Sequence, residues 1–210
     1  MSSLPTAIAE SARSEQRRRA ILDVASQAFL EDGFAATSMS SIAARLGGSK
    51  GTLYNYFRSK EELFAAFMTD VCGSRANALF DNLPPIGEDW RNALIDLGVN
   101  FTGFIMSEPV TAIHRLVVAE ADRFPEVGRL FYESGPKLGE VRLADYMERA
   151  IAEGLLRPCD PLRAARRYKD LMLGDLYNRR QWGVAEPMDE AEMRAIVAEG
   201  VDIFLAYFGR

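Results

Sequence analysis

The sequence predicts an all-α protein of about nine helices. Apolar residues recur with helical spacing along most of the 210 residues, and no long alternating pattern typical of β-strands is present. Caps and helix breakers delimit each predicted helix. The predicted helices cover approximately residues 15–32, 39–46, 50–57, 60–83, 88–106, 108–123, 125–154, 160–182 and 189–208.

Local signals define where these helices begin and end. Gly33 is expected to stop the first helix, and residues 1–13, which contain Pro5, are predicted to form a flexible arm. The pair Gly135-Pro136 is expected to kink the helix at residues 125–154. Asp160 precedes a proline suited to a first helical position, and Asp189 with Glu192 forms a capping-box pattern.

The charge is distributed unevenly along the chain. Overall it is −5, but residues 1–62 carry 8 Lys and Arg against 7 Asp and Glu, whereas the remainder carries 17 against 23. The N-terminal part is therefore +1 and the rest −6. A basic cluster at residues 13 and 17–19 is either a solvated helix face or a set of phosphate or minor-groove contacts.

No apolar run reaches the length of a membrane span, and no secretory signal is visible, so a cytoplasmic protein is expected. Cys72 and Cys159 are far apart and lack metal-binding spacing, which predicts reduced thiols, and nothing in the sequence supports a redox role. No cluster of His, Cys and carboxylates has metal-ligand spacing, and no cofactor is expected.

The stretch from Thr37 to Leu63 predicts two short helices joined by a glycine turn, followed by the start of a third. Thr37 or Ser38 is expected to cap the first short helix, Ser49 the second, and Ser59 with Glu62 the third. Leu53 and Phe57 are expected to face the core. The second short helix carries small, hydroxyl, basic and aromatic side chains, which suit the major groove of DNA. The predicted DNA contacts are Thr37, Ser38, Ser40, Ser49, Lys50, Gly51, Thr52, Tyr54, Asn55, Tyr56 and Lys60.

The segments ILDVASQAFLEDGFAATS and IAARLGGSKGTLYNYFRSKEELF resemble the N-terminal domain of TetR-family transcriptional regulators, with the tight match covering about residues 14–65. Gly48 departs from the family, which usually has Val or a similar apolar residue there. RLVVAEADRFPEVGRLFYE resembles, more weakly, the regulatory domain of an AcrR-like branch. The resemblance implies a DNA-binding domain at residues 1–63, a ligand-binding and dimerisation domain at 64–210, and repression of a palindromic operator that a small, largely apolar ligand relieves.

The resemblance further implies that the last two helices form a four-helix bundle in a homodimer, although their apolar faces could instead be buried within one subunit. The expected interface residues are Leu171, Val197, Val201, Phe204, Leu205 and Phe208. The expected ligand-binding residues are Phe101, Phe104, Ile105, His114, Val117, Val118, Met172, Asp175 and Leu176. His114 could equally be a structural imidazole, and Asp175 could pair with an arginine across the dimer interface.

An enzyme is not expected, because the chain lacks a G-x-S-x-G turn and GGSKGT lacks the spacing of a phosphate-binding loop. Two other functions remain open. The same fold could serve as a protein-interaction module that uses DNA only as a location cue, or it could act alone as a small-molecule binding or catalytic protein without specific DNA binding.

Overall fold

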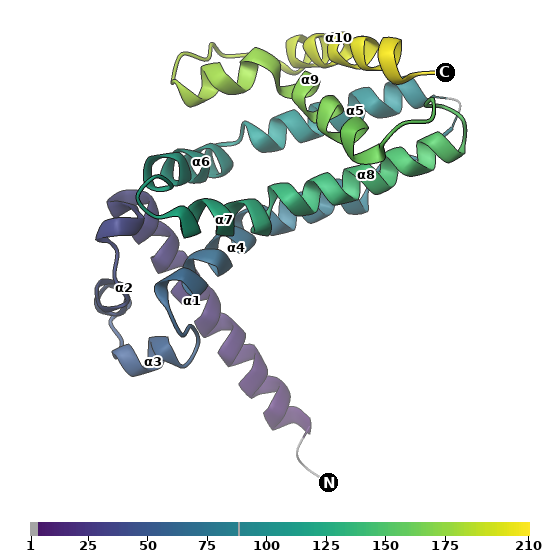
Figure 1. Ribbon diagram of the computed structural model, residues 1–210. Helices are drawn as coiled ribbons and strands as arrows, with labels where there is room; N and C mark the ends of the chain where they lie inside the picture. The colour runs from purple at the N-terminus through teal and green to yellow at the C-terminus, as the bar shows by residue number, and fades with distance from the viewer. Residues whose placement is uncertain (1–3, 88) are drawn as a thin grey trace. The chain divides into compact units, whose positions relative to one another are not determined.

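A computed structural model describes the backbone of residues 4–87 and 89–210, and the side chains of residues 12–71, 78–87 and 89–210. These residues form ten helices and, apart from one backbone bridge between Leu156 and Gly209, no strand (Figure 1). The all-α prediction is confirmed. The helices are α1 (Leu4–Ala36), α2 (Met39–Arg45), α3 (Lys50–Tyr54), α4 (Lys60–Asp81), α5 (Trp90–Ile105), α6 (Glu108–Glu120), α7 (Pro125–Ser134), α8 (Pro136–Ala152), α9 (Pro161–Gln181) and α10 (Glu190–Phe208).

Most predicted caps are present. Ser38 caps α2, Ser49 caps α3 and Asp160 caps α9, each by accepting a backbone N–H of the first turn. Asp189 and Glu192 form the predicted capping box of α10. At α4 the box is displaced, because Ser59 accepts from Glu62 while the Glu62 carboxylate accepts from Arg58 N rather than from Ser59 N.

Two helix boundaries differ from the prediction. α1 begins at Leu4, so the predicted arm is wrong over residues 4–13, and residues 1–3 lie outside the described chain. Pro5 is compatible with this start, because a first-turn residue has no helical partner for its N–H. Gly135 leaves the helical conformation and Pro136 begins a new helix, so the predicted kink is a full break that separates α7 from α8.

The chain divides into two compact units. The first comprises the residues up to Asp70 together with Leu116–Phe131, and the second comprises Val71–Arg115 and Tyr132–Arg210. The division into a DNA-binding domain at residues 1–63 and a ligand-binding domain at residues 64–210 remains a prediction. α4 and α6 each begin in one unit and end in the other.

An aromatic cluster lies at the centre of the first unit. Phe29, Phe34, Phe64 and Phe67 are all at most 1% exposed, and their ring centroids are 5.0–6.0 Å apart. Burial of large aromatic side chains is a major source of stability in a small unit. This cluster therefore holds α1 against the first turns of α4.

In the second unit α9 packs against α5, α8 and α10, and two glycines permit the close approach. A Cβ atom at Gly98 would lie 2.6 Å from Val197 Cγ1 and 2.7 Å from Met172 Sδ. A Cβ atom at Gly200 would lie 2.9 Å from the carbonyl oxygen of Leu171. Neither position has room for a side chain, so both glycines set the spacing between helices.

α10 places its predicted interface residues mostly inside the subunit. Val197, Val201, Phe204 and Phe208 are at most 3% exposed and belong to the core of the second unit, so their assignment to a dimer interface is wrong. Leu171 and Leu205 are half-buried and pack against the same core. The cause is that α10 is apolar on two faces, and sequence alone does not tell which face packs on α5 and α9.

We predict that Gly98→Ala lowers the free energy of unfolding by about 1–3 kcal/mol, because the added methyl group overlaps Val197 and Met172. Gly103→Ala in the same helix, with no atom within 4 Å of the added Cβ, is the matched control. It should be neutral or stabilising by up to about 1 kcal/mol. Urea unfolding at one fixed protein concentration measures both, and equal effects would contradict the packing argument.

Candidate nucleic-acid interface and ligand pocket

α2, α3 and the turn between them form a two-helix corner in the first unit, which we call the α2–α3 corner (Figure 1). Ile42 and Ala43 of α2 and Leu53 of α3 are at most 2% exposed, so these side chains fix the corner to the core. Gly47 has a φ of 65° in the connecting turn, a conformation that glycine adopts without steric cost. The apolar residues thus fix one side of the corner and leave the other side for contacts outside the chain.

The outer side of α3 carries most of the predicted DNA contacts. Lys50, Gly51, Tyr54 and Asn55 are exposed, and Thr52 and Tyr56 are half-buried. Gly51 leaves the backbone accessible, whereas Lys50 and Tyr54 supply donors for phosphate or base edges. The sequence prediction and the exposure of these side chains therefore agree.

The hydroxyl groups at the starts of α2 and α3 have structural partners. The Ser38 hydroxyl caps α2, with Ser41 N at 3.0 Å, and Ser49 Oγ lies 3.0 Å from Thr52 Oγ1. Ser40 is exposed on the first turn of α2. A DNA contact by Ser38 or Ser49 would be made by a hydroxyl that already accepts a backbone hydrogen bond.

Thr37 is not available to DNA, and its predicted contact is wrong. It is 1% exposed, and its hydroxyl donates to the carbonyl oxygens of Gly33 at 2.7 Å and Ala28 at 3.2 Å. A buried hydroxyl needs such partners. Thr37 therefore fixes the end of α1.

Lys60 also has a partner within the chain. Its Nζ donates to the carbonyl oxygen of Phe34 at 2.8 Å and lies 4.0 Å from the centroid of the Phe34 ring. The carbonyl and the ring both favour a cation there. Lys60 therefore has a structural partner 26 positions away, and its predicted phosphate contact remains a prediction for the two further N–H donors of the ammonium.

The basic residues 13 and 17–19, in the first half of α1, are divided between two roles. Arg13 and Arg19 are exposed, whereas the guanidinium of Arg18 lies 5.3 Å from the centroid of the Phe57 ring. Arg17 lies beside the turn between α2 and α3, where a Cβ atom at Gly48 would be 3.1 Å from Arg17 Nη2. The unusual glycine thus gives this guanidinium room beside α3, which the sequence alone did not indicate.

Arg45 neutralises two acidic residues near the α2–α3 corner, Glu31 and Asp32. Its guanidinium pairs with Glu31 at 2.8 Å and Asp32 at 2.7 Å, linking α2 to α1. Hydrogen bonds with Gln27 and Arg45 lower the pKa of Glu31, so this carboxylate stays ionised and paired. The pairing reduces the repulsion that two free carboxylates would exert on a phosphate backbone.

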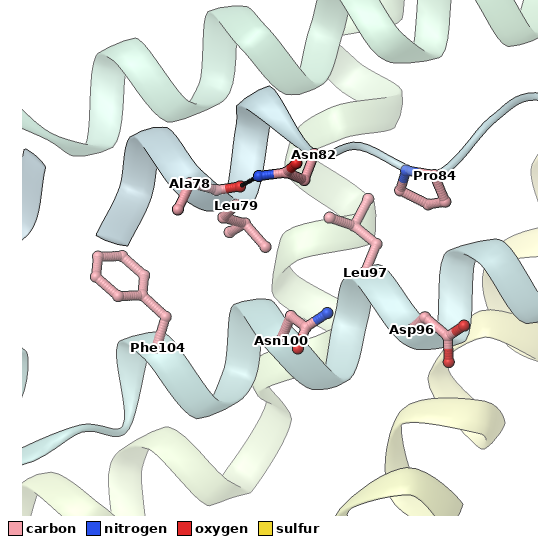
Figure 2. Close-up of a pocket in the computed structure, with 8 residues that line it drawn as sticks. All are labelled: Ala78, Leu79, Asn82, Pro84, Asp96, Leu97, Asn100 and Phe104. Atoms are coloured by element: carbon pink, nitrogen blue, oxygen red, sulfur yellow. Dashed lines mark hydrogen bonds between the residues drawn. The ribbon is translucent and has the colours of Figure 1, made fainter. Parts of the chain in front are cut away.

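A pocket of about 340 Å³ lies in the second unit between α4 and α5. Figure 2 shows Leu79 and Leu97 near its centre, Phe104 at one end and Pro84 at the other. This volume lies within the usual range for small-molecule sites. The lining residues are Ala78, Leu79, Asn82, Pro84, Asp96, Leu97, Asn100 and Phe104.

Two of the three polar side chains of the pocket, Asn82 and Asp96, present hydrogen-bond acceptors, whereas the amide of Asn100 carries both donors and an acceptor. Asn82 Nδ2 already donates to the carbonyl oxygen of Ala78 at 2.7 Å, which leaves the Asn82 side-chain oxygen as an acceptor. Asp96 Oδ1 accepts from Arg194 at 2.6 Å, and a carboxylate has further acceptor sites. The pocket therefore suits an apolar molecule that carries N–H or O–H donors.

Of the predicted ligand-binding residues, Phe104 lines this pocket. Met172 is fully buried in the core, and Phe101 packs against the same core. Val117 is buried and Val118 is 62% exposed, and both belong to the first unit. Ile105 and Leu176 are half-buried and are not among the residues that line the pocket. The prediction favoured apolar side chains, and no pattern in the sequence indicated a pocket between α4 and α5 beside Asn82 and Asp96.

His114 and Asp175 have different surroundings. His114 lies edge-on to Tyr177, with ring centroids 5.3 Å apart, and burial lowers its pKa while a hydrogen bond with Gln181 opposes the shift. The burial of the ring thus favours the neutral imidazole. Asp175 is exposed and lies 3.9 Å from Arg179 on the same helix, so the charge needs no ligand to compensate it.

Cys159 is half-buried, and burial raises the pKa of its thiol, with Arg163 and Arg157 opposing the shift. A raised pKa reduces the thiolate fraction and hence the reactivity. The side chain of Cys72 lies outside the described residues. In the part of the chain that the structure describes, no helix is both long and apolar enough to cross a membrane.

Comparison with known proteins identifies two matching families. Residues 21–67 match the family described as bacterial regulatory proteins, tetR family. Residues 92–210 match the C-terminal domain of AefR-like transcriptional repressors. The second match alone covers more than half of the chain.

Individual relatives agree with these matches. The Flavonoid-responsive Regulator FrrA is 34% identical, with a TM-score of 0.80 over 93% of this chain and 98% of that one. A structure described as a TetR-family transcriptional regulator from Mesorhizobium loti MAFF303099 is 28% identical, with a TM-score of 0.81 over 94% and 99% of the two chains. The uncharacterized HTH-type transcriptional regulator YhgD of Bacillus subtilis (strain 168) is 26% identical over 155 residues, which span 70% of this chain and 76% of that protein.

Proposed function

Because the chain belongs to the TetR family of DNA-binding transcriptional regulators, a family without enzymatic activity, we propose that it is a homodimeric repressor of a palindromic operator. A small, largely apolar ligand that binds the second unit releases it from DNA. The main support is α3, whose buried Leu53 turns Lys50, Tyr54 and Asn55 outward together.

Repression is supported by the match to the C-terminal domain of AefR-like transcriptional repressors. The AcrR-like resemblance of residues 115–133 remains a prediction, since the matched C-terminal family is the AefR-like one. The protein-interaction alternative has no structural feature in its favour, and operator selection tests it directly.

Dimerisation is supported by the outer face of α10. Ile196, Ile203 and Tyr207 recur at helical spacing and are 38%, 52% and 56% exposed. We propose these three side chains as the dimer interface, in place of the buried residues that the sequence predicted. A two-fold dimer would set two copies of α3 about one DNA turn apart, ~34–36 Å.

For the ligand, we propose a small, largely apolar molecule with hydroxyl or amine donors, bound between α4 and α5. The apolar floor at Leu79, Leu97 and Phe104 and the acceptors of Asn82 and Asp96 support this class. FrrA, a protein of similar fold, is flavonoid-responsive, and flavonoids combine aromatic rings with hydroxyl donors.

DNA fragments selected by the purified protein should contain an inverted repeat. On such a fragment, Lys50→Ala should weaken binding and lose about 1–3 kcal/mol of discrimination at one base pair if Lys50 reads a base. Tyr54→Phe should weaken all sequences alike, as expected for a phosphate contact. Lys137→Ala, which removes a lysine at an exposed position of α8 in the second unit, is the matched control and should bind as the wild type does.

The measurement is an affinity titration at several salt concentrations. If Lys50 contacts only phosphate, the salt slope falls by about 1 and no base preference changes. Failure of the folded wild-type protein to select any sequence would favour the interaction-module alternative.

Ile203→Glu should convert the dimer to a monomer, because it places a charge at the centre of the proposed apolar face of α10. Leu138→Glu is the matched control, since Leu138 of α8 is similarly exposed, at 58%, but lies on another helix. Sedimentation velocity separates the outcomes. A dimer that survives Ile203→Glu would contradict this interface.

The flavonoid naringenin should bind the protein and release it from the selected operator, whereas its trimethyl ether, which lacks the hydroxyl donors, should bind at least about tenfold more weakly. Ala78→Trp, at the pocket wall, should block binding, whereas Ala152→Trp, on an exposed part of α8, should not. Calorimetric titration measures each pair. A tenfold difference in affinity corresponds to about 1.4 kcal/mol, which is about the net contribution of one hydrogen bond. Equal binding of naringenin and the ether would therefore refute the role of the acceptors.

A further inference from the structure

The chain between α1 and α2 makes an unusual corner, which we call the α1–α2 corner (residues 33–37). Gly33 has φ 82° and ψ 167°, which interrupts the helix in a region that favours glycine. The hydroxyl of Thr37 donates a hydrogen bond back to the carbonyl oxygen of Gly33 at 2.7 Å. Ser38 follows at once as the cap of α2, so the direction of α2 and α3 depends on this corner.

Glu120, the last residue of α6, reaches the corner within the first unit. Its Oε1 accepts the backbone N–H of Ala35 at 3.1 Å. A Cβ atom at Gly33 would lie 2.8 Å from the same oxygen. Glycine is therefore favoured at position 33 for two reasons: it adopts the positive φ, and it leaves room for the carboxylate of Glu120.

The same peptide group, between Phe34 and Ala35, is also held from another helix. Lys60, at the start of α4, donates to the carbonyl oxygen of Phe34 at 2.8 Å. Phe124, just beyond α6, packs edge-on to the Phe34 ring with centroids 5.5 Å apart, and Lys60 Nζ is 5.9 Å from the centroid of the Phe124 ring. The carbonyl and the N–H of this one peptide group thus bond to side chains from α4 and α6.

We propose that Glu120 is a positioning residue for DNA binding, because its bond to Ala35 fixes the corner from which α2 and α3 emerge. The inference rests on the proposed function and names the residue that holds α2 and α3 in position for it.

The test compares three variants on the operator selected by the wild-type protein. Glu120→Ala should bind about fivefold to tenfold more weakly, as expected for the loss of one hydrogen bond to a charged acceptor. Glu120→Gln keeps a side-chain acceptor and should bind within about twofold of the wild type. Asp122→Ala, at an exposed position two residues later, should bind as the wild type does.

The thermal midpoint and the amide exchange of Ala35 are measured on the same samples. In Glu120→Ala the Ala35 amide should exchange faster, and in Glu120→Gln it should be restored. A lower thermal midpoint with unchanged operator affinity would overturn the positioning role, as would equal weakening by Ala and Gln. If the wild type selects no operator, the proposed function fails, whereas the exchange of Ala35 still tests whether Glu120 holds the corner.

Discussion

The positive φ of Gly33 is the constraint on which the DNA-binding unit depends. It ends the regular helix where Phe34 can enter the aromatic cluster and Thr37 can bond back to the end of α1. If α1 continued as a regular helix, Ser38 could not cap α2 in an extended conformation. The α1–α2 corner therefore converts a local property of one glycine into the orientation of two later helices.

The shortness of α3 makes this support necessary. A helix of five residues has almost no intrinsic stability, because nucleation fixes several residues for few hydrogen bonds. Leu53 and Phe57 bury its inner side, and Arg18 lies over the Phe57 ring. Since these contacts hold α3, Lys50 and Tyr54 have no structural task and remain available outside the chain.

The sequence predicted what depends on neighbours in the chain and failed where distant residues decide. The caps at Ser49 and Asp189 need only a side-chain oxygen and an N–H three residues later, so both were predicted correctly. Thr37 is an exception, because its hydroxyl donates to the carbonyl of Gly33 only four residues back, and its assignment to DNA overlooked this local bond. The structural partner of Lys60, the carbonyl of Phe34, lies 26 positions away, which spacing cannot reveal. The same reason hid the space constraint at Gly98, which depends on residues of α9 and α10.

Charge gives a reason for the proposed dimer that is independent of the apolar face of α10. The N-terminal 62 residues have a net charge of only +1, and Arg45 and Lys60 are occupied within the unit. A single copy of α3 therefore offers few phosphate contacts, and affinity for DNA grows with the number of phosphates neutralised. Two copies on one palindrome would double these contacts, and binding of the second would be intramolecular. Because the net charge of the N-terminal residues is so small, the affinity for DNA depends on how the two copies of α3 are placed. The α1–α2 corner of each subunit and the outer face of α10 determine that placement.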